Sequence, residues 1–98
     1  MTLAEVLENI ESADRELTIC AERNPRSSPL SRAILAREPE NGELPKDAEG
    51  LEYLLEVFFV HDVLEVWSAW RGGRNPSVQE KCEAVTYYAE NDSYLPVE

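Results

Sequence analysis

Two helix-capping motifs constrain the fold of this 98-residue chain more than any other feature: a Thr-x-x-Glu motif that begins at Thr2 and a Ser-x-x-Glu motif that begins at Ser77. In such a capping box, the two side chains satisfy free backbone N–H groups at the start of a helix. Apolar residues follow each motif at helical spacing. The motifs therefore predict helices over residues 2–12 and 77–91.

A third helix is predicted by an apolar stripe whose members lie three or four residues apart. The stripe consists of Val60, Val63, Leu64, Trp67 and Trp70. We expect this helix to begin near Val60 or His61 and to end at the Gly72-Gly73 pair. Both tryptophans are expected in the core, and the alternative is that one of them anchors an interface.

The segments between the first two helices favour strands. Residues 15–23 and 30–37 are expected to form an antiparallel pair around a loop at 24–29, although 30–37 is also compatible with a helix. Residues 38–45 are a predicted polar loop, and 46–50 a single helical turn. Residues 51–57 are predicted as a third strand, with a continuous helix over 47–71 as the alternative.

These elements define an α+β class, with about three antiparallel strands packed against about three helices. A chain of 98 residues is expected to form a single globular domain, residues 1–98, with one modest core. No stretch approaches the ~20 apolar residues of a membrane span. The first five residues lack the basic and apolar regions of a signal peptide, so we expect a cytoplasmic protein.

Negative charge is the strongest indication of function. The chain has a formal net charge of −11, and residues 38–65 contain nine acidic residues and one basic residue. Such a field repels nucleic acid and anionic membranes and attracts basic proteins. Elsewhere the two signs are interspersed, as on an ordinary soluble surface. The sequence therefore predicts a basic protein partner, with no direct binding to nucleic acid or membrane.

The expected contacts with this partner are the acidic side chains of the same region, whose carboxylates can imitate phosphate groups. They are Glu40, Glu43, Asp47, Glu49, Glu52, Glu56, Asp62 and Glu65. A solvated surface without a partner is the alternative explanation for such a charge run. Whether residues 51–57 form a strand or a helix decides how Glu52 and Glu56 are oriented.

No residue pattern indicates catalysis. A nucleophilic site would have to combine His61 with Cys20 or Cys82, and neither cysteine lies in a recognisable signature. We expect both cysteines to be free, buried, apolar side chains. A single histidine and two distant cysteines do not suggest a zinc site. The sequence therefore predicts a protein that is not an enzyme and has no metal and no cofactor.

Several segments resemble a group of small acidic bacterial proteins. The runs from Asn75 to Glu80 and from Ala84 to Tyr94 resemble the ending of that group, and Thr2 to Ile10 resembles its opening. A Gly-Leu-x-Tyr segment at residues 50–53 fits as well, so that the resemblance covers about half of the chain. Members of the group look like immunity proteins of toxin–immunity systems, including contact-dependent growth inhibition.

This resemblance implies a cytosolic inhibitor that binds the toxin domain of a neighbouring cell and blocks its active site. Many such toxins are nucleases with basic substrate-binding faces, and the group suggests no catalytic residues. A phage-type inhibitor of a host nuclease, acting by nucleic-acid mimicry, is one alternative. A protein-interaction module without inhibitory activity is another.

Overall fold

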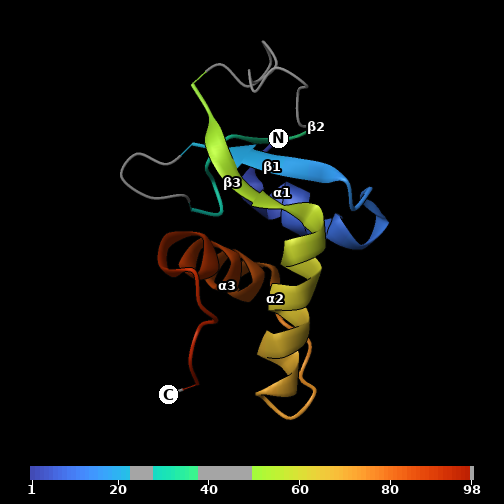
Figure 1. Cartoon of the computed structure of the whole chain (residues 1–98), viewed down its shortest axis with the longest axis vertical. Helices are drawn as coiled ribbons and strands as arrows, with labels where there is room; N and C mark the ends of the chain where they lie inside the picture. The colour runs from blue at the N-terminus through green and yellow to red at the C-terminus, as the bar shows by residue number, and fades with distance from the viewer. Residues whose placement is uncertain (23–27, 38–49, 98) are drawn as a thin grey trace.

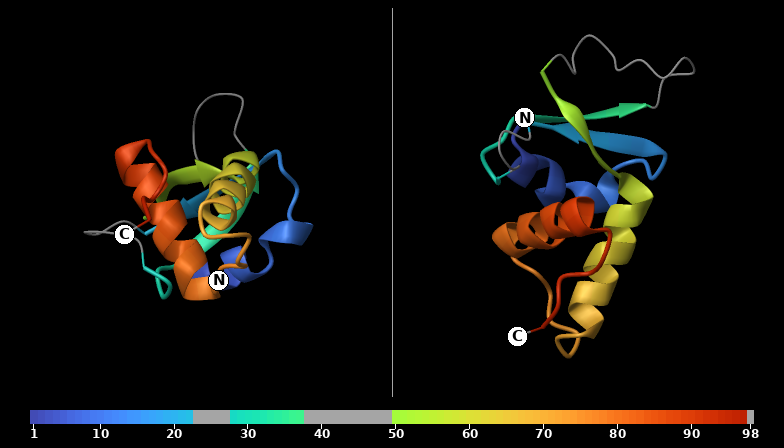
Figure 2. Two further views of the ribbon diagram at one scale, coloured as in Figure 1. Left: turned by 90° about the horizontal axis from the view of Figure 1, so that it is seen from below. Right: turned by 60° about the vertical axis from the view of Figure 1, so that its left-hand side comes forward.

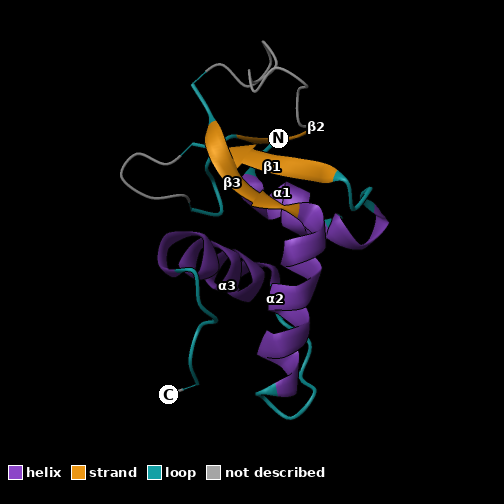
Figure 3. Ribbon diagram, viewed as in Figure 1, coloured by secondary structure: helices purple, strands orange, loops and turns teal. Residues whose placement is uncertain are grey.

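The computed structural model describes residues 1–22, 28–37 and 50–97. Within them the elements, in chain order, are α1 (Leu3–Glu8), the 3₁₀ turn η1 (Ile10–Ser12), β1 (Leu17–Ala21), β2 (Ala33–Arg37), β3 (Glu52–Glu56), α2 (Val57–Ala69) and α3 (Val78–Asn91). The strands form one antiparallel sheet, and the helices lie on one side of it (Figures 1 and 3). This is the predicted α+β architecture.

The sheet has the order β2-β1-β3, with the most buried strand in the centre. Four of the five residues of β1 are buried, as expected for the central strand of the sheet. Leu17 lies opposite Arg37 at one end of the β1–β2 pair, and Ala21 lies opposite Ala33 at the other. The β1–β3 register shifts between Ile19 and Cys20, so β3 contains a bulge.

The main core lies between the inner face of the sheet and the helices. Its fully buried large side chains include Leu3, Leu7, Ile10, Ile19, Val57, Val60, Val63 and Val85. Cys20 belongs to a smaller cluster on the other face of the sheet, with Leu51 and Ile34. Cys20 and Cys82 are both free and buried, which confirms that prediction.

The first helix is shorter than predicted, because α1 ends at Glu8 and the chain continues as η1. The capping box at Thr2 is present, with Glu5 as its partner. Asn9 breaks the helix: its side-chain amide donates to the Glu5 carbonyl at 2.9 Å, and its own carbonyl accepts from the Ser12 hydroxyl at 3.0 Å. Such local side-chain bonds compete with the regular helical pattern.

The strands are also shorter than predicted. β2 begins at Ala33 instead of residue 30, because the Ser31 N–H bonds to the Ser28 carbonyl and closes a turn. Leu30 is consequently 84% exposed. β1 begins at Leu17 because the Asp14 carboxylate accepts from the Glu16 N–H and forms a turn there.

Residues 52–56 form a strand, so the alternative of one helix over 47–71 is wrong. Pairing with β1 decides the conformation of this segment, which local propensity left open. The prediction that α2 begins near Val60 or His61 is also wrong, because α2 begins at Val57. That start places both Val57 and Val60 in the core.

The two tryptophans of α2 have different environments. Trp67 is 4% exposed, whereas Trp70 is 51% exposed, so the expectation that both lie in the core is wrong. The buried side of the helix passes through Val60, Val63 and Trp67, and Trp70 lies on its flank. The Gly72-Gly73 pair follows the helix, and both residues have the left-handed φ that favours glycine.

The third helix begins as predicted, with Ser77 and Glu80 forming a capping box. Arg74 extends this motif by donating two hydrogen bonds to the Glu80 carboxylate, at 3.0 and 2.8 Å. The Arg74 bonds, together with those from Ser77, lower the pKa of Glu80 to about 2. The carboxylate is thus favoured in its charged form in the folded state.

This lowered pKa predicts an acid-dependent contribution of Glu80 to stability. An unfolded Glu titrates near pH 4.3, so the stabilisation is complete above that pH and is lost as the pH falls toward about 2. Glu80→Gln keeps an acceptor for the capping box but does not titrate. The difference in urea midpoint between the wild type and Glu80→Gln should therefore shrink from about pH 5 to about pH 2. The difference in urea midpoint between the wild type and Arg74→Gln should also shrink over this pH range. If either difference stays constant with pH, Glu80 is not the group whose titration lowers the stability.

The C-terminal residues return from the end of α3 along α2 (Figures 1 and 2). Tyr94 and Leu95 are half-buried and pack against the main core, as predicted for the tail. Among the described residues, no helix is both long enough and apolar enough to cross a membrane.

Candidate protein-interaction surface

The structure describes four of the eight acidic residues that were predicted to contact a partner. Glu52 and Glu56 lie on β3, and Asp62 and Glu65 lie on α2. The other four lie outside the described residues: Glu40, Glu43, Asp47 and Glu49. β3 leads directly into α2, so the described acids follow one continuous segment (Figure 1).

Asp62 and Glu65 share the solvent-facing side of α2. Together with Phe58 and Ala69 they lie at i, i+4, i+7 and i+11, and all four residues are exposed. Phe58, at the start of the helix, is 43% exposed. This side of α2 therefore presents the aromatic ring of Phe58 near the start of the helix, followed by the carboxylates of Asp62 and Glu65.

The β-bulge separates the acids of β3. Glu56 lies opposite Thr18, and Tyr53 lies opposite Cys20, so these two residues of β3 share the outer face of the sheet. The Tyr53 hydroxyl lies 3.4 Å from the Glu56 carboxylate. Glu52 lies opposite Ala21 and is exposed on the other face. The structure therefore does not bring the four described acids onto one flat patch.

A row of aromatic rings, which the sequence reasoning did not predict, runs beside the acidic side of α2. The aromatic row consists of Phe58, Phe59, Tyr88, Tyr94 and Trp70. Successive ring centroids are separated by 4.3, 6.4, 5.3 and 5.9 Å. The two end rings are exposed, and the three middle rings are half-buried. No local pattern joins these residues in the sequence, because they come from α2, α3 and the tail.

Carboxylates lie close to the middle of the aromatic row. Burial raises the pKa of the Tyr88 hydroxyl, and the charges of Asp92 and Asp62 raise this pKa further, as does Tyr94. Asp92 caps α3 in a left-handed conformation, and its N–H donates to the Tyr88 carbonyl at 2.8 Å. Asp62 lies on α2, and Asp92 follows Tyr88 by one turn at the end of α3.

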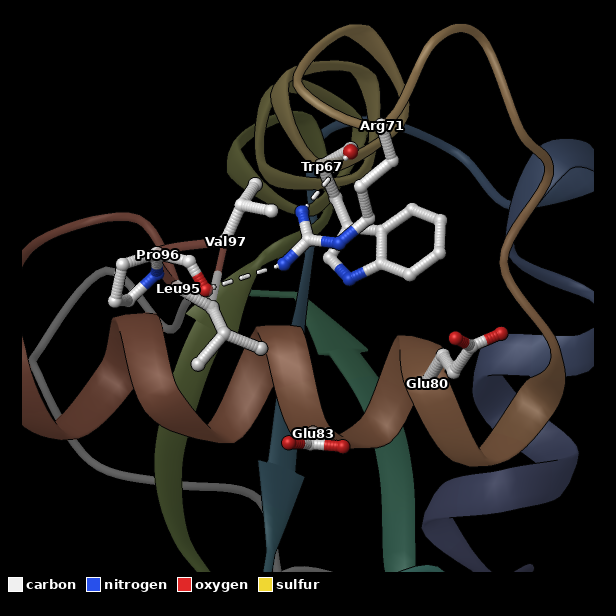
Figure 4. Close-up of a pocket in the computed structure, with 7 residues that line it drawn as sticks. All are labelled: Trp67, Arg71, Glu80, Glu83, Leu95, Pro96 and Val97. Carbon is white, nitrogen blue, oxygen red and sulfur yellow. Dashed lines mark hydrogen bonds between the residues drawn. The ribbon is translucent and has the colours of Figure 1, made fainter.

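The buried Trp67 lies beside an open hollow of about 240 Å³, which Arg71 also lines (Figure 4). Two arginines cover the Trp67 ring. The guanidinium carbons of Arg71 and Arg74 lie 4.4 and 4.6 Å from the ring centroid. Arg71 also donates to the Trp67 carbonyl at 3.0 Å and to the Pro96 carbonyl at 3.4 Å. Arg71 therefore fastens the tail to the end of α2.

The opposite flank of α2 lines a second open hollow, of about 290 Å³, with residues of mixed charge. Glu11, Asp62 and Glu65 line it together with Arg15 and Lys81. His61 also lines it, and its Nε2 is the single buried side-chain nitrogen or oxygen without a hydrogen bond in the described part of the chain. Within residues 1–22, 28–37 and 50–97, no cluster of His, Cys, Asp and Glu is arranged to hold a metal ion.

The environment of the cysteines disfavours nucleophilic chemistry. Burial raises the pKa of the Cys82 thiol to about 11 and also raises that of Cys20. A thiol attacks as its thiolate, so reactive cysteines have lowered pKa values. Cys20 and Cys82 have raised pKa values, so their thiolate forms are disfavoured.

The fold and the surface define a small α+β domain with an acidic and aromatic side on α2 and α3. The chain belongs to a family described as a domain of unknown function (DUF7716), whose model matches residues 1–97. No curated protein and no solved structure matches the chain.

Proposed function

We propose that this chain is an immunity protein that binds a basic toxin domain in the cytoplasm and blocks its active or substrate-binding face. The observation that carries the proposal is the exposed side of α2, where Asp62 and Glu65 lie beside the aromatic row. The net charge of −11 and the resemblance of both ends of the chain to immunity proteins support the same role.

The proposed mechanism is occlusion of a nuclease. Carboxylates on α2 and β3 occupy the positions at which the toxin would bind phosphate groups of nucleic acid. Their long-range field accelerates encounter with a basic partner, while aromatic rings supply most of the affinity once they are desolvated. Steering and anchoring residues adjoin one another on α2, as such a mechanism requires.

The volumes of the hollows and the pKa values of the cysteines also favour a binding role over catalysis. The two open hollows beside α2 measure about 240 and 290 Å³, below the usual range for small-molecule sites. Both cysteines have raised pKa values. These features support the proposal of an inhibitor rather than an enzyme.

The test is co-purification with the toxin domain encoded immediately upstream of this chain. The untagged chain should form a complex with the tagged toxin domain at about 0.15 M salt, and weaken at about 0.5 M salt, where surface charges are screened. Co-expression should also protect cells from the toxin. The absence of both a complex and protection would contradict the proposal, and a location in a phage operon would favour a phage-type inhibitor.

A further inference from the structure

The aromatic row has features of a binding surface rather than of an outer layer of core. Its two ends, Phe58 and Trp70, are 43% and 51% exposed. Single exposed apolar residues are ordinary, but a contiguous apolar surface with a polar rim marks an interaction site. Successive ring centroids lie 4.3 to 6.4 Å apart from the start of α2 to its end, so half-buried rings connect the two exposed end rings.

The helices that carry this surface also carry two carboxylates, one on α2 and one at the end of α3. Asp62 projects from the exposed side of α2, and Asp92 is fixed at the end of α3 by its left-handed cap. Asp62 follows Phe58 and Phe59 by one turn of α2, and Asp92 follows Tyr88 by one turn of α3, so each carboxylate is a sequence neighbour of rings in the row. The nearby guanidinium groups of Arg71 and Arg74 cover Trp67 and make hydrogen bonds there, so they are already engaged elsewhere.

Aromatic faces next to carboxylates are complementary to a cationic side chain. The ring faces attract a cation through their quadrupoles, and the carboxylates accept its hydrogen bonds. A guanidinium satisfies both at once, because it is planar, stacks on aromatic rings and donates in a fork geometry that matches a carboxylate. A lysine ammonium offers a point charge without the stacking plane.

We propose that the aromatic row between Asp62 and Asp92 is the docking site for an arginine side chain of a basic protein partner. A second copy of this chain is disfavoured as the occupant, because each copy has a net charge of −11. The proposal deepens the proposed function by naming the side chain that the inhibitor receives. It rests on that function only in taking the partner to be a basic protein.

The first test is calorimetric titration with an octa-arginine peptide at about 0.05 M salt, where electrostatic attraction is weakly screened. Replacing Tyr88 and Tyr94 by leucine keeps an apolar side chain at each position and removes two ring faces. We expect Tyr88→Leu/Tyr94→Leu to weaken peptide binding at least about fivefold. The control, Tyr87→Leu, removes a half-buried ring of α3 that does not belong to the aromatic row, and it should change binding less than about twofold. Equal effects in the two variants would overturn the proposal.

A second test changes only charged side chains, so its result does not depend on how the aromatic rings repack. Asp62→Asn/Asp92→Asn removes two charges without changing shape, and asparagine tolerates the left-handed conformation of residue 92. Glu8→Gln/Glu16→Gln removes the same charge from exposed positions in the N-terminal part. We expect only the first pair to weaken octa-arginine binding more than about threefold. An equal loss in both pairs would indicate diffuse attraction and overturn the site.

Two further measurements decide the identity of the occupant. Octa-arginine should bind more tightly than octa-lysine, and equal affinities would overturn the preference for a guanidinium. Sedimentation of the wild type should show a monomer, and a dimer that Trp70→Ser dissociates would assign the surface to a second copy. These assays contain no toxin, so their failure and the failure of the protection assay are distinguishable.

Discussion

The variant Glu52→Gln/Glu56→Gln/Asp62→Asn/Glu65→Gln should associate with the toxin domain at least about tenfold more slowly than the wild type at low ionic strength. These four acids lie on the strand and helix that carry the proposed interface. Charge complementarity acts mainly on the rate of encounter, so the association rate should change more than the dissociation rate. Stopped-flow mixing at about 0.02 M and about 0.5 M salt measures both the effect and its screening.

The matched control removes four charges from other exposed parts of the chain. Glu8→Gln/Asp14→Asn/Glu16→Gln/Glu83→Gln has the same net charge as the interface variant, and all four positions are exposed. A nonspecific effect of net charge would slow both variants equally. That result would contradict an acidic interface on β3 and α2, even if the chain still protected cells.

The fold could be predicted where local chemistry decides the conformation. The capping boxes fixed the starts of α1 and α3, because each satisfies backbone donors within four residues of sequence. The prediction of free, buried cysteines rested on their number and spacing and on the expectation of a reducing compartment. In contrast, the local pattern of residues 52–56 is compatible with either a strand or a helix. These residues form a strand because they pair with β1, which lies more than 30 residues earlier in the chain.

The candidate surface could be predicted only in part, for a related reason. The acidic segment is contiguous in sequence, so its charge was evident before the structure was known. The aromatic row joins Phe59, Tyr88 and Tyr94 from three separate segments, and no spacing rule connects them. The two tryptophans carried a partial signal, because the alternative to two core residues was that one of them anchors an interface, and Trp70 is the exposed one. Glu40, Glu43, Asp47 and Glu49 lie outside the described residues, and their role in binding stays a prediction.

Leu7→Ala should lower the free energy of unfolding by about 2–5 kcal/mol, a large part of the total of about 5–15 kcal/mol expected for a domain. Leu7 is fully buried on α1 and belongs to the main core. Truncation removes apolar contacts and leaves a cavity that the neighbours fill only partly. Urea unfolding should show a lower midpoint with an unchanged slope. The matched control is Leu30→Ala, at a position that is 84% exposed, which should change stability by less than about 0.5 kcal/mol.

The size of this effect tests how α1 is held in the fold. A six-residue helix is too short to be stable by itself, so α1 depends on its capping box and on packing. Its first two N–H groups bond to the Ser31 and Pro29 carbonyls at 2.8 and 3.0 Å, and the Lys81 ammonium lies 3.4 Å from the Leu7 carbonyl. Detaching α1 would therefore expose the inner face of the sheet and one side of α3 together. A loss below about 1 kcal/mol would contradict this arrangement, because it would mean that Leu7 is not enclosed between them.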